Sequence, residues 1–203
     1  MKKYLLLLLA VCCLVACDND EFVAAGPDVD GFTTEELEAL SQGFDATKID
    51  HQQLIADLTE GAIWDVRYLD TWMEDSKEWV YNPVYGGGFY CYWWVFEKNG
   101  TALNYSETGS YLNGSPITYR NCDERLWRYK EETGDIVIAP TNYYNEWRLK
   151  VLYYNSPILM FTLTYDKMPK EYNQPAETKR FVTNLRSLSN AQAKEQIRKL
   201  TEE

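Results

Sequence analysis

The residues that could perform chemistry are few and are not grouped. His51 is the only histidine, and it falls in the first turn of a predicted helix, where a surface position is expected. No histidine stands near a nucleophile, so Ser-His and Cys-His arrangements are excluded. Carboxylates such as Asp65 and Glu97 could form an acid-base pair, but no spacing singles out one pair among the many acids.

Cofactor and metal motifs are also missing from the sequence. No phosphate-binding loop or dinucleotide fingerprint occurs, and no Cys/His spacing is typical of a metal site. The formal net charge of −11 argues against binding to nucleic acid or to anionic lipid. We therefore expect a protein that is not an enzyme and that holds no cofactor and no metal.

The first sixteen residues have the pattern of a secretory signal. Lys2 and Lys3 form a basic start, and an apolar run over 5–14 is too short, with these flanks, for a membrane-spanning helix. The following Leu14-Val15-Ala16-Cys17 resembles the bacterial lipobox. That resemblance implies cleavage before Cys17 and acylation of Cys17, for example with palmitate, so that the N-terminal lipid is the only contact with the membrane.

Residues 17–31 are acidic and lack an apolar period, which predicts a tether between lipid and domain. The run from Asp18 to Glu21 is similar to the acidic surface-export signal of Bacteroidota lipoproteins, and a plain solvated linker is the alternative. We expect a cell-envelope protein anchored to the outer membrane, in either the periplasmic or the surface-exposed leaflet.

Two cysteines, Cys91 and Cys122, remain in the expected mature domain. In an exported protein they either pair as a disulfide or remain buried free thiols, because the geometry of the fold decides.

Helices are predicted at both ends of the domain, over 32–60 and 187–203. Thr33 with Glu36, and Asp50 with Gln53, form N-terminal capping patterns, and Gly61 ends the second helix. Ser189 and Gln192 cap the C-terminal helix.

Residues 61–186 read as eight antiparallel strands from the alternation of apolar and polar residues. The predicted strands are 63–69, 90–96, 101–106, 126–130, 135–139, 146–154, 158–165 and 178–185. Eight such strands close into an up-and-down barrel without free edges. Tight turns follow the even-numbered predicted strands. Long loops follow the odd-numbered ones, over 70–89, 107–125, 140–145 and 166–177. One end of the barrel is therefore closed by hairpins, and the other end is an open mouth.

Residues 58–185 resemble the bacterial lipocalin-like domains. Trp64 after a short helix and Gly61 is similar to the lipocalin signature around a glycine and a tryptophan, and 96–101 is similar to the F-x-x-D/N-G-T hairpin of that group. In lipocalins a basic residue of the last strand packs on the signature tryptophan. The resemblance therefore implies that Arg180 or Arg186 stacks on Trp64 and closes the barrel.

Aromatic residues that could bind a ligand are frequent in the strands and in the first long loop, which in lipocalins is a lid over the mouth. The candidates are Trp72, Trp79, Tyr81, Tyr85, Phe89, Tyr92, Trp94, Tyr105 and Tyr143. Such rings suit a small, partly apolar or amphipathic ligand, or the flat face of a glycan. Their alternative role is to fill the core and pack the loops onto the rim.

Three hypotheses follow from this pattern. The first is a non-enzymatic binding domain with its ligand at the open end. The second is a surface interaction protein with a filled barrel that contacts a glycan or a protein through its loops. The third, an enzyme on a calycin-like barrel, would need titratable groups inside the barrel, whereas the predicted inward set is nearly all aromatic and aliphatic.

Overall fold

The computed structural model describes residues 32–64, 66–80, 90–112, 115–140, 146–165 and 177–202. The predicted signal peptide, the predicted lipidation site Cys17 and the predicted acidic tether lie outside the described residues. No helix in these ranges is long and apolar enough to cross a membrane.

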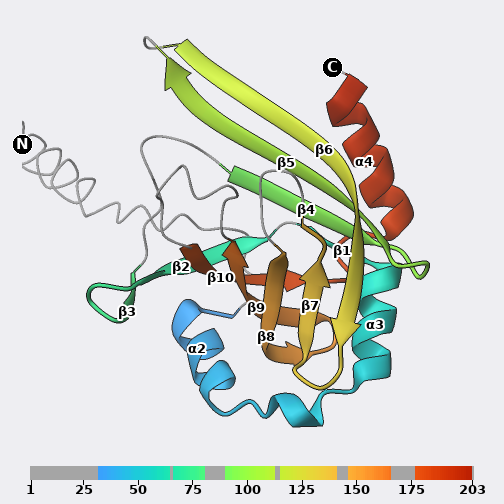
Figure 1. The fold of residues 1–203 in the computed structure, drawn as a ribbon. Coiled ribbons are helices and arrows are strands. Elements are labelled where there is room, and N and C mark those ends of the chain that lie inside the picture. The colour runs from blue at the N-terminus through green and yellow to red at the C-terminus, as the bar shows by residue number, and fades with distance from the viewer. Residues whose placement is uncertain are drawn as a thin grey trace, which may run out of the picture.

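A single antiparallel sheet of ten strands forms the domain, in the order β1-β4-β5-β6-β7-β8-β9-β10-β2-β3 (Figure 1). The strands are β1 (Ala62–Ile63), β2 (Arg67–Met73), β3 (Glu78–Val80), β4 (Tyr90–Phe96), β5 (Thr101–Leu112), β6 (Ser115–Lys130), β7 (Asp135–Ile138), β8 (Trp147–Asn155), β9 (Ile158–Tyr165) and β10 (Glu177–Asn184). The predicted mainly β class and the up-and-down order from β4 to β10 are confirmed.

The predicted eight-stranded barrel is wrong, because the sheet is not closed. The first predicted strand is divided: Ile63 pairs with Trp94 of β4, whereas Arg67 already pairs with Val182 of β10. The other side of β2 is then occupied by β3, which pairs with it in a hairpin from Thr71 to Met73. Since β3 takes the edge that β4 would need, the ladder stays open.

The long loop predicted over 107–125 is also wrong. The strands β5 and β6 remain paired without interruption from Thr101 opposite Leu126 to Leu112 opposite Ser115. This hairpin extends beyond the rest of the sheet (Figure 1). The pairing satisfies the backbone N–H and C=O groups of the segment, although its sequence contains only scattered strand-favouring residues such as Thr118 and Tyr119.

The two ends of the sheet differ as the loop lengths predict. The tight turns lie beside the N-terminal helices, since Lys98 pairs with Glu60, Ser156 bonds Asp57, and Gly134 approaches Ile49. The opposite end carries the β2–β3 turn, the β5–β6 hairpin and the connections that follow β7 and β9. We call these the closed end and the open end.

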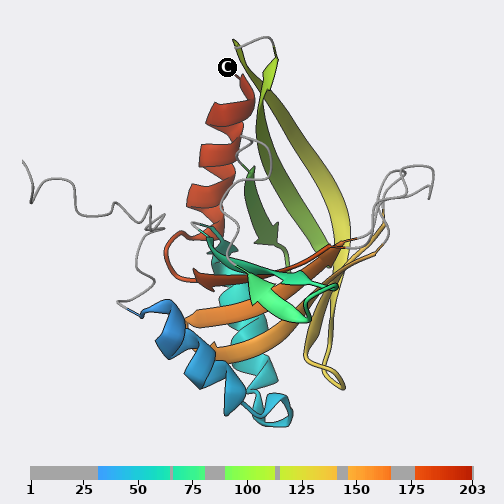
Figure 2. The same cartoon turned by 90° about the vertical axis from the view of Figure 1, so that its left-hand side faces the viewer.

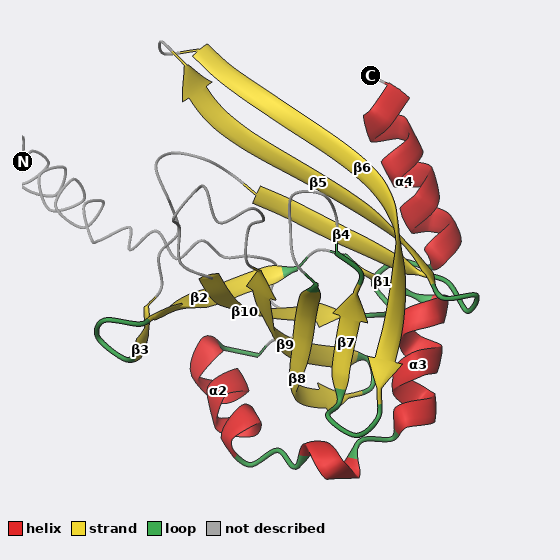
Figure 3. Cartoon of the chain, viewed as in Figure 1, coloured by secondary structure: helices red, strands yellow, loops and turns green. Residues whose placement is uncertain are grey.

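Within the described residues, helices lie against the sheet at both ends of the chain (Figure 3). They are α2 (Thr34–Gln42), the 3-10 turn η1 (Ala46–Lys48), α3 (His51–Glu60) and α4 (Asn190–Glu202). The predicted caps are confirmed. Thr33 and Glu36 form a reciprocal capping box, and Asp50 accepts a hydrogen bond of 3.0 Å from the Gln53 amide. These bonds satisfy amide groups that the first helical turn leaves without partners.

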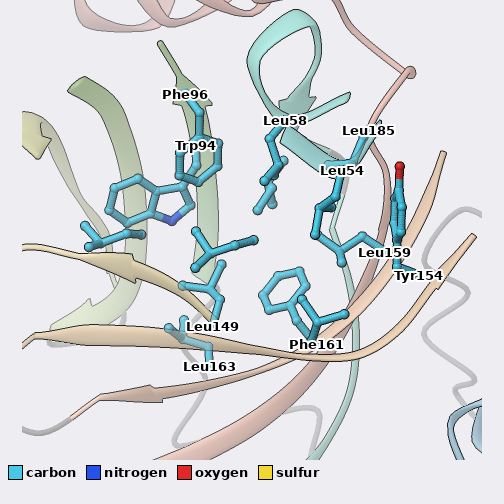
Figure 4. Close-up of a cluster of buried hydrophobic side chains, with 14 of the residues drawn as sticks. Leu54, Leu58, Trp94, Phe96, Leu149, Tyr154, Leu159, Phe161, Leu163 and Leu185 are labelled. Atoms are coloured by element: carbon cyan, nitrogen blue, oxygen red, sulfur yellow. The ribbon is translucent and has the colours of Figure 1, made fainter. Parts of the chain in front are cut away.

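The main core lies between α3 and the concave face of the sheet. Leu54 and Leu58 of α3 face Trp94, Phe96 and Leu149 of the strands (Figure 4). All five are at most 2% exposed. The closed end of the concave face is therefore filled by side chains, as the second hypothesis expects for the interior.

The other two helices cover the convex face. Leu37 of α2 packs with Met160 and Val182. The α4 helix runs alongside β5 and β6 (Figure 2), and its Ala193 and Ile197 pack with a cluster that contains Tyr105. The described helices thus pack on the concave face through α3 and on the convex face through α2 and α4.

Candidate functional site

A buried arginine marks the open end of the concave face. Arg125 lies on β6, two residues before Trp127 in the chain. Trp127 is the first β6 residue that pairs with β7, so Arg125 lies past the end of that pairing. The neighbouring Leu126 carbonyl accepts a hydrogen bond of 2.8 Å from the Ala139 amide, where the connection after β7 begins. Only 5% of the Arg125 side chain is exposed. Its positive charge therefore acts from a site that bulk water screens poorly.

Two tryptophan rings flank the guanidinium group of Arg125. The guanidinium carbon of Arg125 lies 4.7 Å from the ring centroid of Trp147 and 5.7 Å from that of Trp94. The two indoles meet edge to face, with their centroids 5.6 Å apart. A cation over an indole face is attracted by the ring quadrupole, most strongly where water is excluded. We call Trp94, Asn104, Asp123, Arg125 and Trp147 the Arg125 cage.

Polar members complete the cage. Asp123 approaches Arg125 with an oxygen-nitrogen distance of 3.6 Å, and its side chain is 35% exposed. The buried Asn104 is register partner to both Asp123 and Trp94. A guanidinium between aromatic walls favours an anionic group attached to a flat or apolar body. The cage thus combines one buried cation, two aromatic walls and a partly exposed carboxylate.

The sequence-based candidates are divided by the structure. Trp94 belongs to the cage, whereas Tyr105 is fully buried beneath α4 on the convex face. The backbone of Tyr92 lies in β4, opposite Ser106. The remaining ring candidates Tyr81, Tyr85, Phe89 and Tyr143 lie outside the described residues.

Sequence reasoning missed Arg125 and did not assign Trp147 to the site. Arg125 stood in the predicted loop over 107–125, just before a predicted strand. The sequence pattern that places Arg125 on the strand is present, because Arg125, Trp127 and Tyr129 occupy alternate positions and so lie on one strand face. Extending the strand by a few residues would have placed the arginine with the aromatic rings.

Trp72 and Trp79 come together, but on the convex side. They are paired across β2 and β3, and their ring centroids are 5.4 Å apart. The guanidinium carbon of Arg180 lies 4.4 Å from the Trp79 centroid. Arg180 also contacts Glu38 of α2, whereas the adjacent Phe181 packs into the concave core. Successive strand residues face opposite sides, so the tryptophan pair shares the α2 side.

Of the two residues expected to stack on Trp64, Arg180 or Arg186, Arg180 stacks on Trp79 instead. The Nε of Arg180 donates to Asp70 at 2.5 Å, and its Nη2 donates to the other carboxylate oxygen. Burial disfavours the charge of Arg180, but the hydrogen bond and charge of Asp70 outweigh it and raise the pKa of Arg180. Trp64 packs elsewhere, with Ala193 and Ile197 of α4.

The predicted alternative of a Cys91–Cys122 disulfide is wrong as well. Cys122 is a free, exposed thiol. Cys91 lies on β4 and Cys122 on β6, with β5 paired between them. Two strand spacings amount to about 9–10 Å, which exceeds the roughly 7 Å over which Cα atoms can be bridged.

The lone histidine near the closed end has a structural partner. Nδ1 of His51 lies 2.7 Å from the hydroxyl of Tyr129, and burial, aided by the charges of Glu131 and Asp135, raises the pKa of Tyr129 to about 12. Among the residues that the structure describes, no group of three or more His, Cys, Asp or Glu could hold a metal ion. Asp65 lies outside the described residues, so the imaginable pair with Glu97, which no spacing singles out, is not tested.

Comparisons with known proteins give no family. A scan against protein-family models and searches of curated proteins and of solved structures found no match.

Proposed function

We propose that this chain is a non-enzymatic, lipid-anchored envelope protein that binds a small, partly apolar ligand at the open end of its concave sheet. The observation that carries the proposal is the Arg125 cage, where a guanidinium lies 4.7 Å from the Trp147 ring. The cage suits a ligand with an apolar body against Trp94 and Trp147 and a negative group toward Arg125.

The cellular setting in this proposal comes from the leader. Acylated Cys17 would hold the domain at the outer membrane of a Bacteroidota-type envelope, in either leaflet, with residues 17–31 as the tether. A distant relation to lipocalin-like domains stays part of the proposal. It is supported by the up-and-down order of strands β4 to β10.

A second candidate function is surface recognition of a glycan or a protein. It is favoured by the partly buried pair of Trp72 and Trp79 at the edge of the sheet. Arg180 fixes the Trp79 ring, and Asp70 fixes Arg180, so the pair is held rigidly. Rigid indoles stack well on the apolar faces of sugars.

Intrinsic tryptophan fluorescence tests the first candidate. The mature chain from residue 17, with Cys17→Ser, is titrated separately with fatty acids, bile acids, haem-like pigments and oligosaccharides. The proposal expects saturable quenching or a blue shift with an anionic class, weakened in Arg125→Gln and retained in Arg148→Gln. Arg148 is the matched control, because it follows Trp147 directly but is 53% exposed.

The same titration separates the two candidates. A response to oligosaccharides alone, lost in Trp72→Ala and Trp79→Ala but kept in Arg125→Gln, would replace the first function by the second. No response to any class would contradict ligand binding at the open end.

A further inference from the structure

A hollow lies at the closed end, and its lining includes no residue of the Arg125 cage. It is a groove of about 400 Å³ between α3 on one side and the Lys98–Gly100 turn with β6 on the other. We propose that this groove binds a small, ring-sized apolar molecule that carries one carboxylate. The proposal does not depend on the function assigned to the open end.

The groove exists because small residues face large rings. Along α3, Gln52, Ile55, Ala56 and Thr59 form one helix face with the spacing i, i+3, i+4 and i+7. Ala56 and Gly100 have little or no side chain, whereas Trp127 on the opposite wall has the largest. The volume falls within the range of about 300–1,000 Å³ that is usual for small-ligand sites.

The aromatic wall presents carbon rather than polar atoms. The Trp127 Nε1 donates to the Glu97 carbonyl at 3.0 Å, and the Tyr129 hydroxyl is bonded to His51. Trp127 also meets Phe96 edge to face, with centroids 4.9 Å apart. These contacts fix both rings, so the lining toward the groove is preorganised for an apolar body.

The charge at the rim selects the polar end of the ligand. Lys98 and Arg128 line the groove, and no Asp or Glu is among the described residues that line it. This is unusual for a chain with 31 acidic and 20 basic residues. The lining itself thus carries two positive charges, whose acidic partners Glu60 and Glu146 lie outside it, and a cationic lining favours an anion.

Lys98 and Arg128 form only exposed ion pairs, which a ligand can replace. Lys98 lies 3.6 Å from Glu60, and both side chains are at least 70% exposed. Arg128 is 62% exposed and lies 2.9 Å from Glu146. Exposed ion pairs contribute little to stability, so a bound carboxylate can replace either protein carboxylate with little loss.

The experiment uses naphthalene-1-carboxylate as the probe and naphthalene-1-carboxamide as the neutral match. Each is titrated into the isotope-labelled mature chain with Cys17→Ser, and backbone amide shifts are recorded by NMR. The proposal expects saturable shifts centred on Ala56, Gly100 and Arg128. It expects at least fivefold tighter binding of the carboxylate than of the carboxamide.

Three variants attribute the result to the groove. Ala56→Phe fills it and should abolish the shifts. The double variant Lys98→Gln with Arg128→Gln should reduce carboxylate affinity at least fivefold and leave carboxamide affinity unchanged. Lys48→Gln is the control, because Lys48 is 81% exposed and lies outside the groove. The double variant alters only exposed side chains, so it keeps the test decisive if Ala56→Phe does not fold.

The proposal is overturned if the shifts map to the open end, if the carboxamide binds as tightly as the carboxylate, or if folded Ala56→Phe binds like the parent. The absence of any saturable shift also overturns it.

Discussion

The guanidinium carbon of Arg125 lies 4.7 Å from the ring centroid of Trp147, inside a sheet whose concave face is otherwise largely apolar. The two residues are far apart in sequence, and the fold joins them where β6 runs past the end of β7. This contact places one positive charge at the open end, next to aromatic walls. The stability and binding of the domain should both depend on it.

Arg125→Lys should destabilise the domain although it keeps the charge. Lysine has no planar group to stack on Trp147, and we expect a loss of about 0.5–2 kcal/mol in urea unfolding. The control is Arg148→Lys at an exposed position, where a change within about 0.5 kcal/mol is expected. Equal losses of unfolding free energy in the two variants would show that the Arg125–Trp147 contact does not stabilise the domain.

Gly61→Ala should be strongly destabilising. A Cβ at Gly61 would lie 1.6 Å from the Leu185 carbonyl oxygen, so the chain after β10 would have to move. We expect a loss of about 2–4 kcal/mol in the free energy of unfolding. Gly43→Ala is the matched control, because a Cβ there meets nothing within 4 Å. A small effect at Gly61 would mean that α3 and residue 185 are not held together as described.

Asp57 should make the domain sensitive to acid. It is 5% exposed and accepts hydrogen bonds from Ser156 at 2.5 Å, Tyr154 at 2.8 Å and Gln53 at 2.9 Å. Burial opposes the charge, but these bonds and the charge of Arg186 outweigh it, so the pKa of Asp57 lies below its ordinary 3.8.

The sign of the pH dependence follows from that direction. The folded state binds the Asp57 proton less readily than the unfolded state, so the stabilisation is present above pH 3.8 and is lost as the pH falls through the folded pKa. Asp57→Asn should lose about 1–3 kcal/mol at pH 7 because buried donors lose their anionic acceptor. Its unfolding free energy should also fall less than the parent's below pH 4. Parallel pH profiles would refute this role.

Cys122 should react as a free thiol in the native protein. Although the residue is exposed, partial desolvation of the thiol and the charge of Asp123 raise the pKa of Cys122 above its ordinary 9.0. The rate with a thiol-specific disulfide reagent should therefore be low at pH 7 and should rise steeply with pH. Cys122→Ser should remove this reaction. Intact mass under non-reducing conditions should show no internal disulfide, and a bridged species would contradict the strand order β4-β5-β6.

Local features of the fold were predictable, and long-range ones were not. The caps at Thr33 and Asp50 depend on residues three positions away, and the strands depend on alternation within each segment. The division of the first strand depends instead on β3 pairing with β2, which no local pattern indicates. The local pattern of every predicted strand is therefore compatible with a closed barrel, although the sheet is open.

The site was predictable only in part for the same reason. Trp94 was identified by its residue type and its place in a strand. Arg125 was missed because the β5–β6 hairpin was interpreted as a loop that ends at that residue. The partner of Arg180 was misassigned because Trp79 comes under its guanidinium only through the β2–β3 hairpin.

The most direct test of the central claim is a calorimetric titration of the Cys17→Ser mature chain with dodecanoate and with dodecan-1-ol. Their apolar bodies are alike, and only dodecanoate carries a charge for Arg125. We expect dodecanoate to bind about tenfold more tightly or better, since a charge-assisted hydrogen bond contributes about 1.5–3 kcal/mol. This preference should vanish in Arg125→Gln and persist in Arg148→Gln. Equal affinities for the two ligands, or the same preference in Arg125→Gln, would contradict an anionic ligand at the Arg125 cage.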